Sequence, residues 1–216
     1  MIFKRVKVDA GIVDLNNCYI VQDEKTKETI VIDPGAEPEK IIEMLDILDA
    51  KVVYIYLTHC HGDHIGAVRE VKEKYGGKVL IHVDDSQGLY DKNINLSYHT
   101  NVGEIELESD SRVQDNDLIH IGDIEFRVIH TPGHTKGSTC LYCEKEGFLI
   151  SGDTLFRGAW GRTDCPTGSF VDIIDSITKK LVILPDSTLV YPGHGKSTKI
   201  VDERPIYLEL KPRIDI

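Results

Sequence analysis

The sequence predicts an α/β fold in which strands and helices alternate through the first half of the chain. Residues 29–33, 52–57 and 78–82 are short apolar runs rich in β-branched side chains, which is typical of buried strands. The segments between them, starting at Glu37 and at Ile65, carry apolar residues at helical spacing. The order strand, helix, strand, helix, strand is the pattern of a layered α/β domain.

The remaining elements of the first half follow from the same patterns. Two further strands are expected at residues 2–8 and 17–22. The second helix should end at Gly76-Gly77. The polar stretch 84–116 has little periodicity, so we expect irregular loops there, placed to overhang an active site. The apolar faces expected for the two helices are Ile41, Ile42, Leu45 and Leu48, and Ile65, Val68 and Tyr75.

The second half reads as several strands followed by a helix, a weak sign of internal duplication. A hairpin is expected to turn through Gly122-Asp123, and Ser169 with Asp172 resembles a capping box that starts a helix. Between them we expect a long loop at 152–167. The expected strands are 117–121, 124–130, 138–143, 147–150 and 188–191, with a last helix around 202–209 and with Phe170, Ile173, Ile174, Ile177 and Leu181 as the apolar face of the helix after Ser169.

Composition and charge limit the classes of function. At 216 residues and 41% hydrophobic side chains, the chain can bury a core without disulfides. A net charge of −11 argues against nucleic acid or an anionic membrane as partner. No signal peptide or membrane span is recognisable, and five scattered cysteines do not form a disulfide framework. We therefore expect a cytoplasmic protein, and one domain over residues 1–216, because no Pro- or Ser-rich linker divides it.

The most informative stretch is Thr58-His59-Cys60-His61-Gly62-Asp63-His64, directly after the strand 52–57. It places three imidazoles and a carboxylate in seven residues at the end of a rigid element. Neutral imidazole is the commonest metal ligand in proteins, and zinc accepts nitrogen together with carboxylate oxygen. The stretch predicts a metal site, whose further ligands must come from elsewhere.

Three other loops offer such ligands. His134, Asp153 and His194 each follow a predicted strand and stand next to glycine, which allows sharp turns and close approach of the backbone. We interpret Cys60 as a packing residue, and Cys140 and Cys143 as side chains on opposite faces of a strand. The histidines without such a context are interpreted as structural, although His130 could support the His134 loop: His82, His99, His120 and His130.

This ordered set of ligand loops resembles the metallo-β-lactamase superfamily, over nearly the whole chain. The resemblance implies an αββα four-layer sandwich with metals at the edges of the two sheets, and Asp33-Pro34-Gly35 suits a turn of its first sheet. It implies two divalent ions, with zinc favoured and iron or manganese as alternatives. The implied ligands are His59, His61 and His134 for one ion, Asp63, His64 and His194 for the other, and Asp153 for both.

Two ions that share a water lower its pKa, so the ligand set implies hydrolysis by attack of a bridging hydroxide, with Asp63 as the catalytic group that orients it and accepts its proton. Residues 152–164 resemble the short members of the glyoxalase II (hydroxyacylglutathione hydrolase) group. Classical members carry a lysine and a tyrosine here and a C-terminal helical domain; this chain has Arg162 without the tyrosine, and we expect it to lack that domain. We expect a small-molecule thioester as substrate, with Arg162 either binding it or pairing with Asp164.

Two alternatives remain at this point. A mononuclear iron persulfide dioxygenase would use His59, His134 and Asp153 as a two-histidine, one-carboxylate set. A non-catalytic metal-binding protein would leave the complete ligand set idle, which we disfavour. True β-lactamases of the superfamily usually lack the bridging aspartate, so Asp153 argues against that activity.

Overall fold

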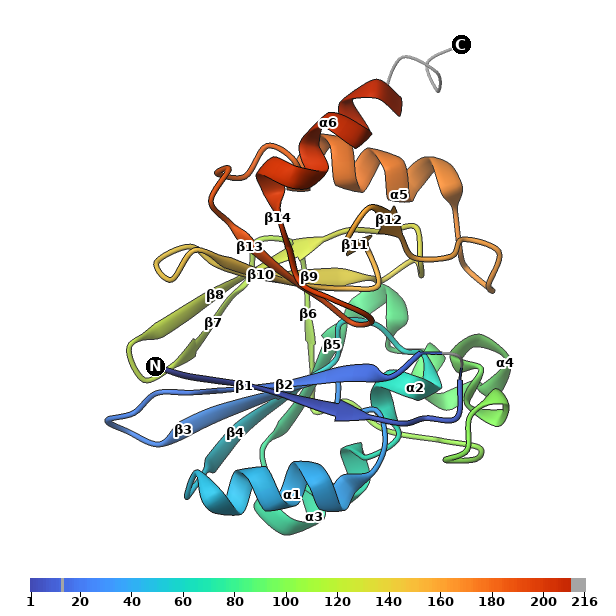
Figure 1. Cartoon of the computed structure of the whole chain (residues 1–216). Helices are drawn as coiled ribbons and strands as arrows, with labels where there is room; N and C mark the ends of the chain where they lie inside the picture. The colour runs from blue at the N-terminus through green and yellow to red at the C-terminus, as the bar shows by residue number, and fades with distance from the viewer. Residues whose placement is uncertain (13, 211–216) are drawn as a thin grey trace.

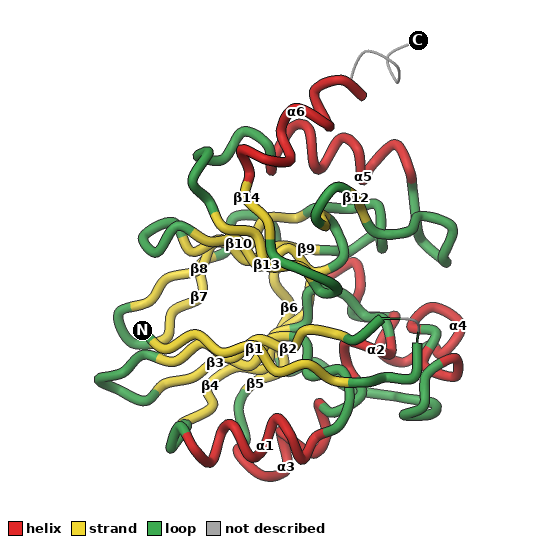
Figure 2. The backbone as a smooth tube through the Cα atoms, viewed as in Figure 1, coloured by secondary structure: helices red, strands yellow, loops and turns green. Residues whose placement is uncertain are grey.

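The computed structural model describes residues 1–12 and 14–210. Two six-stranded β-sheets pack face to face, and helices cover the outer face of each (Figure 1). This arrangement is the αββα sandwich that the resemblance implied, and the prediction of the fold class is confirmed. The same four layers are visible when the backbone is coloured by secondary structure (Figure 2).

The first sheet has the strand order β1 to β6, as in the sequence. The first three strands are antiparallel, whereas β3, β4, β5 and β6 run parallel, so their carboxyl ends meet at one edge. Helices α1 (Pro38–Ile47) and α3 (Val68–Tyr75) cover the outer face. The strands are β1 (Ile2–Val8), β2 (Asn16–Gln22), β3 (Glu28–Ile32), β4 (Lys51–Tyr56), β5 (Lys78–His82) and β6 (Ser111–Val113).

The second sheet has the order β14-β13-β10-β9-β8-β7, in which only β10 and β13 pair in parallel. Helix α5 (Phe170–Ser176), continued by a π-helical turn at Ile177–Leu181, and helix α6 (Ile200–Leu210) cover its outer face. The strands are β7 (Leu118–Ile121), β8 (Ile124–His130), β9 (Thr139–Cys143), β10 (Phe148–Gly152), β13 (Leu189–Pro192) and β14 (Thr198–Lys199).

Short elements fill the two predicted loop regions. The region 84–116 contains 3₁₀ turns and α4, and the loop after β10 contains a small hairpin. Helix α2 (Gly62–Ile65) is separate from α3, where one helix was expected. The short elements are η1 (Val83–Asp85), η2 (Gly88–Tyr90), α4 (Lys92–Asn95), η3 (Ser97–His99), β11 (Leu155–Phe156) and β12 (Ala159–Trp160).

Three apolar layers hold the sandwich together, and strand β2 shows how. Cys18 and Ile20 lie in the layer beneath α1 and α3, whereas Tyr19 and Val21 point into the layer between the sheets. Successive side chains of a strand alternate in direction, so a strand covered on both faces is apolar throughout. The same rule separates Cys140, under α5 and α6, from Cys143, between the sheets, which confirms their placement on opposite faces.

Some sequence expectations were wrong. Strand β6 lies in the region expected to be irregular, because it is a three-residue edge strand with one buried side chain and leaves little pattern. Phe170, placed on the apolar face of its helix, is 47% exposed. It is the first residue of α5, beyond the stripe that reaches the sheet, and its ring lies 6.0 Å from that of Trp160.

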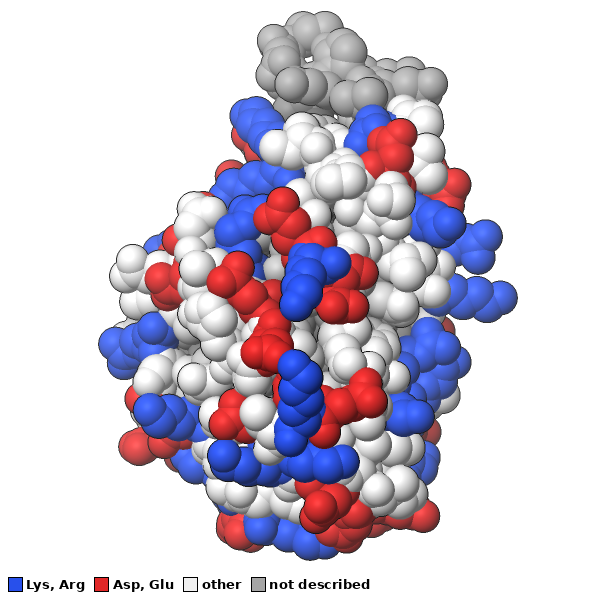
Figure 3. Space-filling model, turned by 90° about the vertical axis from the view of Figure 1, so that its left-hand side faces the viewer, with Lys and Arg blue, Asp and Glu red and all other residues white. Residues whose placement is uncertain are grey.

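Surface charge and helix length can be described for part of the molecule. On the face shown in Figure 3, basic and acidic side chains are interspersed, without a large basic area. Among the described residues, no helix combines the length and the apolarity needed to cross a bilayer.

Candidate metal centre

The seven predicted metal-binding side chains converge where loops of the two sheets meet. His59 and His61 follow β4, and Asp63 and His64 lie in α2. The other three follow β8, β10 and β13 of the second sheet: His134, Asp153 and His194. All seven are mostly buried, and their ligand atoms form overlapping groups in which all members lie within 4.8 Å of one another.

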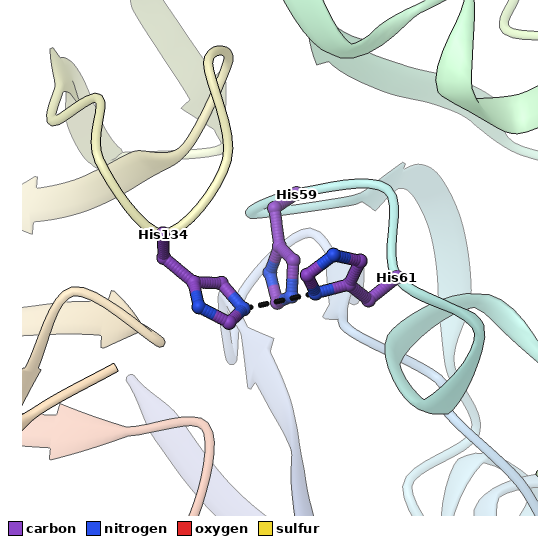
Figure 4. Close-up of side chains that lie close together, drawn as sticks. All are labelled: His59, His61 and His134. Carbon is purple, nitrogen blue, oxygen red and sulfur yellow. Dashed lines mark hydrogen bonds between the residues drawn. The ribbon is translucent and has the colours of Figure 1, made fainter. Parts of the chain in front are cut away.

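The first group consists of His59, His61 and His134. Nδ1 of His61 lies 2.9 Å from Nε2 of His134, and the three rings point toward one another from two loops (Figure 4). Nε2 of His59 is buried without a hydrogen-bond partner among the described residues. Buried nitrogens this close, with one of them unpartnered, are costly unless a ligand fills the space between them.

The second group consists of Asp63, His64 and His194. Nε2 of His194 lies 3.2 Å from Oδ2 of Asp63 and 3.4 Å from Nε2 of His64. Asp153 stands between the groups: its Oδ1 lies 3.5 Å from Nε2 of His64, and its Oδ2 lies 3.6 Å from Nε2 of His134. One carboxylate therefore contacts both groups.

Outer hydrogen bonds fix the orientation of the rings. Nδ1–H of His134 donates to the carbonyl oxygen of Arg162 at 2.8 Å, and Nδ1–H of His64 donates to Oδ2 of Asp33 at 3.0 Å. With Nδ1 protonated, the neutral ring has its lone pair on Nε2, which is the nitrogen that faces the other donors. These tautomers are assigned from the network of hydrogen bonds.

His59 is oriented through a relay. The hydroxyl of Thr58 donates to Oδ2 of Asp33 at 2.7 Å, so the contact of 3.1 Å with Nδ1 of His59 is donated by the ring. The backbone N–H of Thr58 also donates to Asp33, at 2.8 Å. Asp33 thus orients one histidine of each group.

The electrostatics of the two groups differ. Burial lowers the pKa of His61 to about 3 and that of His134 to about 4, so both are neutral near pH 7. Burial would also lower the pKa of His64, but the carboxylates of Asp153, Asp63 and Asp33 together raise it to about 10. The first group is therefore ready to accept a cation, whereas the second must first lose a proton.

The donor set fits divalent metal ions. It combines imidazole nitrogens with two carboxylates, Asp63 and Asp153, in buried surroundings. Burial opposes ionisation of Asp63, but His64 and His194 lower its pKa well below the usual range, so it carries its negative charge. Oδ1 of Asp153 and Nδ1 of His194 are buried without a hydrogen-bond partner among the described residues.

A cavity of about 610 Å³ opens onto this centre. Arg162 reaches its rim and forms a bidentate ion pair with Asp164, at 2.8 and 2.9 Å, with both side chains largely exposed. The cavity wall includes His99, to which the sequence analysis assigned a structural role. The lining residues are Ile12, Asp14, His61, Asp63, Leu96, His99, Thr100, His134, Asp153, Phe156, Arg162, Cys165 and His194.

Sequence reasoning missed three residues that orient the predicted ligands: Asp33, Thr58 and Asn16. Nδ2 of Asn16 donates to Oδ2 of Asp63 at 2.9 Å. Asp33 could have been found, since it directly follows β3, which pairs in parallel with the strand before His59, and so lies at the same edge of the sheet. Asn16 comes from an antiparallel strand and carries no comparable signal.

The residues interpreted as structural lie outside the centre, apart from His99. His82 and His130 stack with ring centroids 4.0 Å apart, and Nε2–H of His130 donates to the carbonyl oxygen of Lys136 in the His134 loop. Although His82, Asp84 and His130 bring ligand atoms together, stacked rings do not aim their lone pairs at one point. Cys60 is fully buried in the apolar layer under the first sheet, as predicted.

Comparison with known proteins gives relatives along most of the chain. The family model described as the metallo-beta-lactamase superfamily matches residues 11–194. An uncharacterized protein of Aquifex aeolicus (strain VF5) is 44% identical over 189 residues, 87% of this chain and 88% of the relative. The probable metallo-hydrolase YqgX of Bacillus subtilis (strain 168) is 33% identical over 92% of this chain and 93% of its own. Hydroxyacylglutathione hydrolase GloC of Haemophilus influenzae is 30% identical over 87% of this chain and 89% of its own.

Solved structures agree in fold. BLEG-1, described as a B3 metallo-beta-lactamase, superposes with a TM-score of 0.86 at 34% identity and covers 94% of this chain and 97% of its own. TTHA1623, in a di-iron-bound form, gives 0.79 at 30% identity over 93% and 96%. ETHE1 from Myxococcus xanthus gives 0.76 at 26% identity over 100% and 92%. With a family model that spans residues 11–194 and relatives of this similarity, the chain belongs to the metallo-beta-lactamase superfamily, whose members bind metal ions.

Proposed function

We propose that this chain is a hydrolase that uses two divalent metal ions to cleave a small-molecule thioester of the hydroxyacylglutathione type. One observation carries the proposal: the carboxylate of Asp153 lies between two three-residue donor groups and contacts His134 of one and His64 of the other. A carboxylate so placed suits a bridge between two ions. The relative GloC supports the class of substrate.

Each donor group would hold one ion. Zinc suits the nitrogen-rich donors, iron is consistent with the di-iron form of TTHA1623, and manganese is a further alternative. When bound, the two ions would activate a water molecule and polarise the carbonyl group of the substrate. The proposed ligands are His59, His61 and His134 for the first ion, Asp63, His64 and His194 for the second, and Asp153 for both.

Asp63 is the proposed catalytic residue of the chain. Its side chain is 14% exposed and lines the cavity, and Asn16 holds its Oδ2 in place. From there the carboxylate can accept a hydrogen bond from the attacking water and take up its proton. The water oxygen adds to the carbonyl carbon, the C–S bond breaks, and the products are a carboxylic acid and a thiol.

The cavity suggests how the substrate lies. Ile12, Leu96 and Phe156 provide an apolar wall, while Arg162 stands at the rim as the cationic group for a substrate carboxylate. Because Asp164 neutralises Arg162, the rim attracts anions only weakly until that ion pair opens.

The test is hydrolysis of S-lactoylglutathione by protein loaded with zinc, manganese or iron, with nitrocefin as a comparison substrate because BLEG-1 is described as a β-lactamase. We expect metal-dependent release of glutathione and little turnover of nitrocefin. Efficient nitrocefin hydrolysis without thioester hydrolysis would contradict the proposal.

A second function is retained because the same centre also offers two histidines and one carboxylate to a single ion. A mononuclear iron persulfide dioxygenase would use His59, His134 and Asp153, of which the last two approach to 3.6 Å. Oxygen uptake with glutathione persulfide distinguishes it. One iron per chain and oxygen uptake without thioester hydrolysis would replace the first proposal with this one.

A further inference from the structure

The side chain of Asp85 joins the two loops that carry the first donor group. Asp85 ends the short turn η1 after β5 and is 3% exposed. Its Oδ2 accepts hydrogen bonds from the backbone N–H of Cys60 at 3.0 Å and from the hydroxyl of Thr135 at 2.7 Å. Its Oδ1 accepts one from the backbone N–H of Gly137 at 2.7 Å. One carboxylate therefore bonds to both loops.

These contacts lie next to the proposed ligands. Cys60 stands between the two histidines of the first loop, and Thr135 directly follows His134. The first loop comes from one sheet and the second from the other, so their separation is set by the contacts that cross between the sheets. Backbone and hydroxyl bonds from Thr139 to the carbonyl oxygen of Thr58 form another crossing contact, farther from His61.

The second loop packs tightly against Asp85. A Cβ atom at Gly137 would lie 2.4 Å from the backbone nitrogen of Asp85 and 2.7 Å from its Cγ, so the second loop presses directly on this residue. Since a carboxylate only accepts, the hydroxyl of Thr135 must donate to it, and the hydroxyl of Ser138 then donates to Thr135 at 2.7 Å. The direction of each hydrogen bond in the network is thus determined.

A purely structural role is a poor explanation for a carboxylate here. Burial raises the pKa of Asp85, and no cationic side chain of the described residues offsets that effect. Burying a charge without a cation costs free energy that a neutral side chain would not incur. What the carboxylate provides is an acceptor for three donors from two loops at once.

We propose that Asp85 is a positioning residue for the first metal ion: it sets the spacing of His61 and His134 by tying their loops together, without touching the ion. The proposal rests on the ligands assigned under the proposed function. Asparagine at this position would present one acceptor and one donor to three N–H and O–H groups, so at least one contact would become repulsive and the loops would shift.

The test is stepwise Zn²⁺ titration of the metal-free full chain against a chromophoric chelator, with wild type compared with Asp85→Asn. We expect the affinity for the first ion to fall about tenfold or more, the effect typical of groups that orient ligands, and the affinity for the second to stay unchanged. The control is Asp23→Asn, a buried carboxylate that accepts from the backbone N–H groups of Lys25 and Thr26 at the end of β2 opposite to Asn16. This variant should have a lower melting temperature and an unchanged affinity for both ions.

A second pair of variants covers the case in which Asp85→Asn does not fold. Thr135→Val removes the hydroxyl that donates to Asp85 and should lower the affinity of the chain for the first ion. Thr135→Ser keeps a hydroxyl at this position and should bind the first ion as tightly as wild type. If wild type binds two ions and Asp85→Asn or Thr135→Val binds both as tightly as wild type does, Asp85 has no positioning role, but the assigned ligands remain supported. If wild type binds no ion at all, the assigned ligands themselves are wrong.

Discussion

His61 and His134 approach each other through different ring atoms, Nδ1 of the first and Nε2 of the second, at 2.9 Å across 73 residues of sequence. The difference matters because an ion between them would bind different nitrogens of the two rings. In His61 it would bind Nδ1, which lies nearer the backbone, and in His134 it would bind Nε2, which lies farther from the backbone. The choice of nitrogen at His134 is enforced by the Arg162 carbonyl oxygen, which occupies its Nδ1.

Substitution by amides tests this assignment. Asparagine places its oxygen near the position of Nδ1, and glutamine places its oxygen near that of Nε2. We therefore expect His61→Asn to retain more affinity for the first ion than His61→Gln, and the order to reverse at His134. Chelator competition with Zn²⁺ measures both pairs. The same order at the two positions would show that the ring atoms are assigned wrongly.

Asp33→Asn should lower the affinity for both ions, because Asp33 orients His59 of the first group as well as His64 of the second. Its Oδ2 accepts from His64 and from the hydroxyl of Thr58, and its Oδ1 accepts from the backbone N–H of Thr58, whereas an asparagine amide can accept at only one of these two positions. We expect a loss of about 10- to 100-fold in affinity. Asp23→Asn is the matched control, since Asp23 also follows a strand and accepts backbone N–H groups, but at the opposite end of β2. An equal loss in both variants would mean that the effect is one of stability.

Metal binding should release protons at one group only. In the metal-free protein, the raised pKa of His64, about 10, means that its ring is protonated at pH 7.5 and must lose a proton before Nε2 can bind an ion. The lowered values of His61 and His134, about 3 and about 4, mean that the first group is already neutral. Affinity for the second ion should therefore rise about tenfold per pH unit from pH 6 to 8, while that for the first stays nearly constant.

Calorimetry in buffers of different ionisation enthalpy counts these protons. One proton or more released with the second ion and none with the first is the expected result. Proton release with the first ion instead would contradict the electrostatic difference between the two groups.

The role of Arg162 can be decided with its partner. If Arg162 binds a carboxylate of the substrate, Arg162→Ala raises KM, and Asp164→Ala, which frees the guanidinium, lowers it. We expect changes in KM of up to about fivefold at unchanged kcat, since an exposed ion pair contributes about 0–1 kcal/mol. If the pair only stabilises the loop, both variants should change KM in the same direction. Steady-state kinetics with S-lactoylglutathione separates the two outcomes.

Much of the fold could be predicted because its signals are local. The strand before His59 is an uninterrupted apolar run, and the serine at position 169 caps its helix by accepting from the backbone N–H of Asp172 at 3.3 Å. Strand β6 and the β11–β12 hairpin could not be predicted, since strands of two or three residues form by pairing with a neighbour rather than by their own pattern.

The candidate site divides in the same way. Side chains such as His59 and His134 stand in loops that follow apolar strands, so the sequence indicates where they should meet. Asp85 and Asn16 act through bonds between distant segments, across 25 residues to Cys60 and 47 to Asp63. Only the folded chain brings these segments together, and nothing in their local sequence marks them.

The most direct test of the account is the metal content of wild type and Asp153→Ala, measured by elemental analysis on anaerobically purified protein together with thioester hydrolysis. We expect two ions per chain in wild type and a folded variant with fewer than two ions and at least about 100-fold lower kcat/KM, since losing a bridging ligand should cost no less than losing a group that orients one. Asp123→Ala, a change in an exposed ion pair with Lys25, should leave both quantities unchanged. Full activity in Asp153→Ala, or a single iron in wild type with oxygen uptake and no hydrolysis, would contradict the two-metal site.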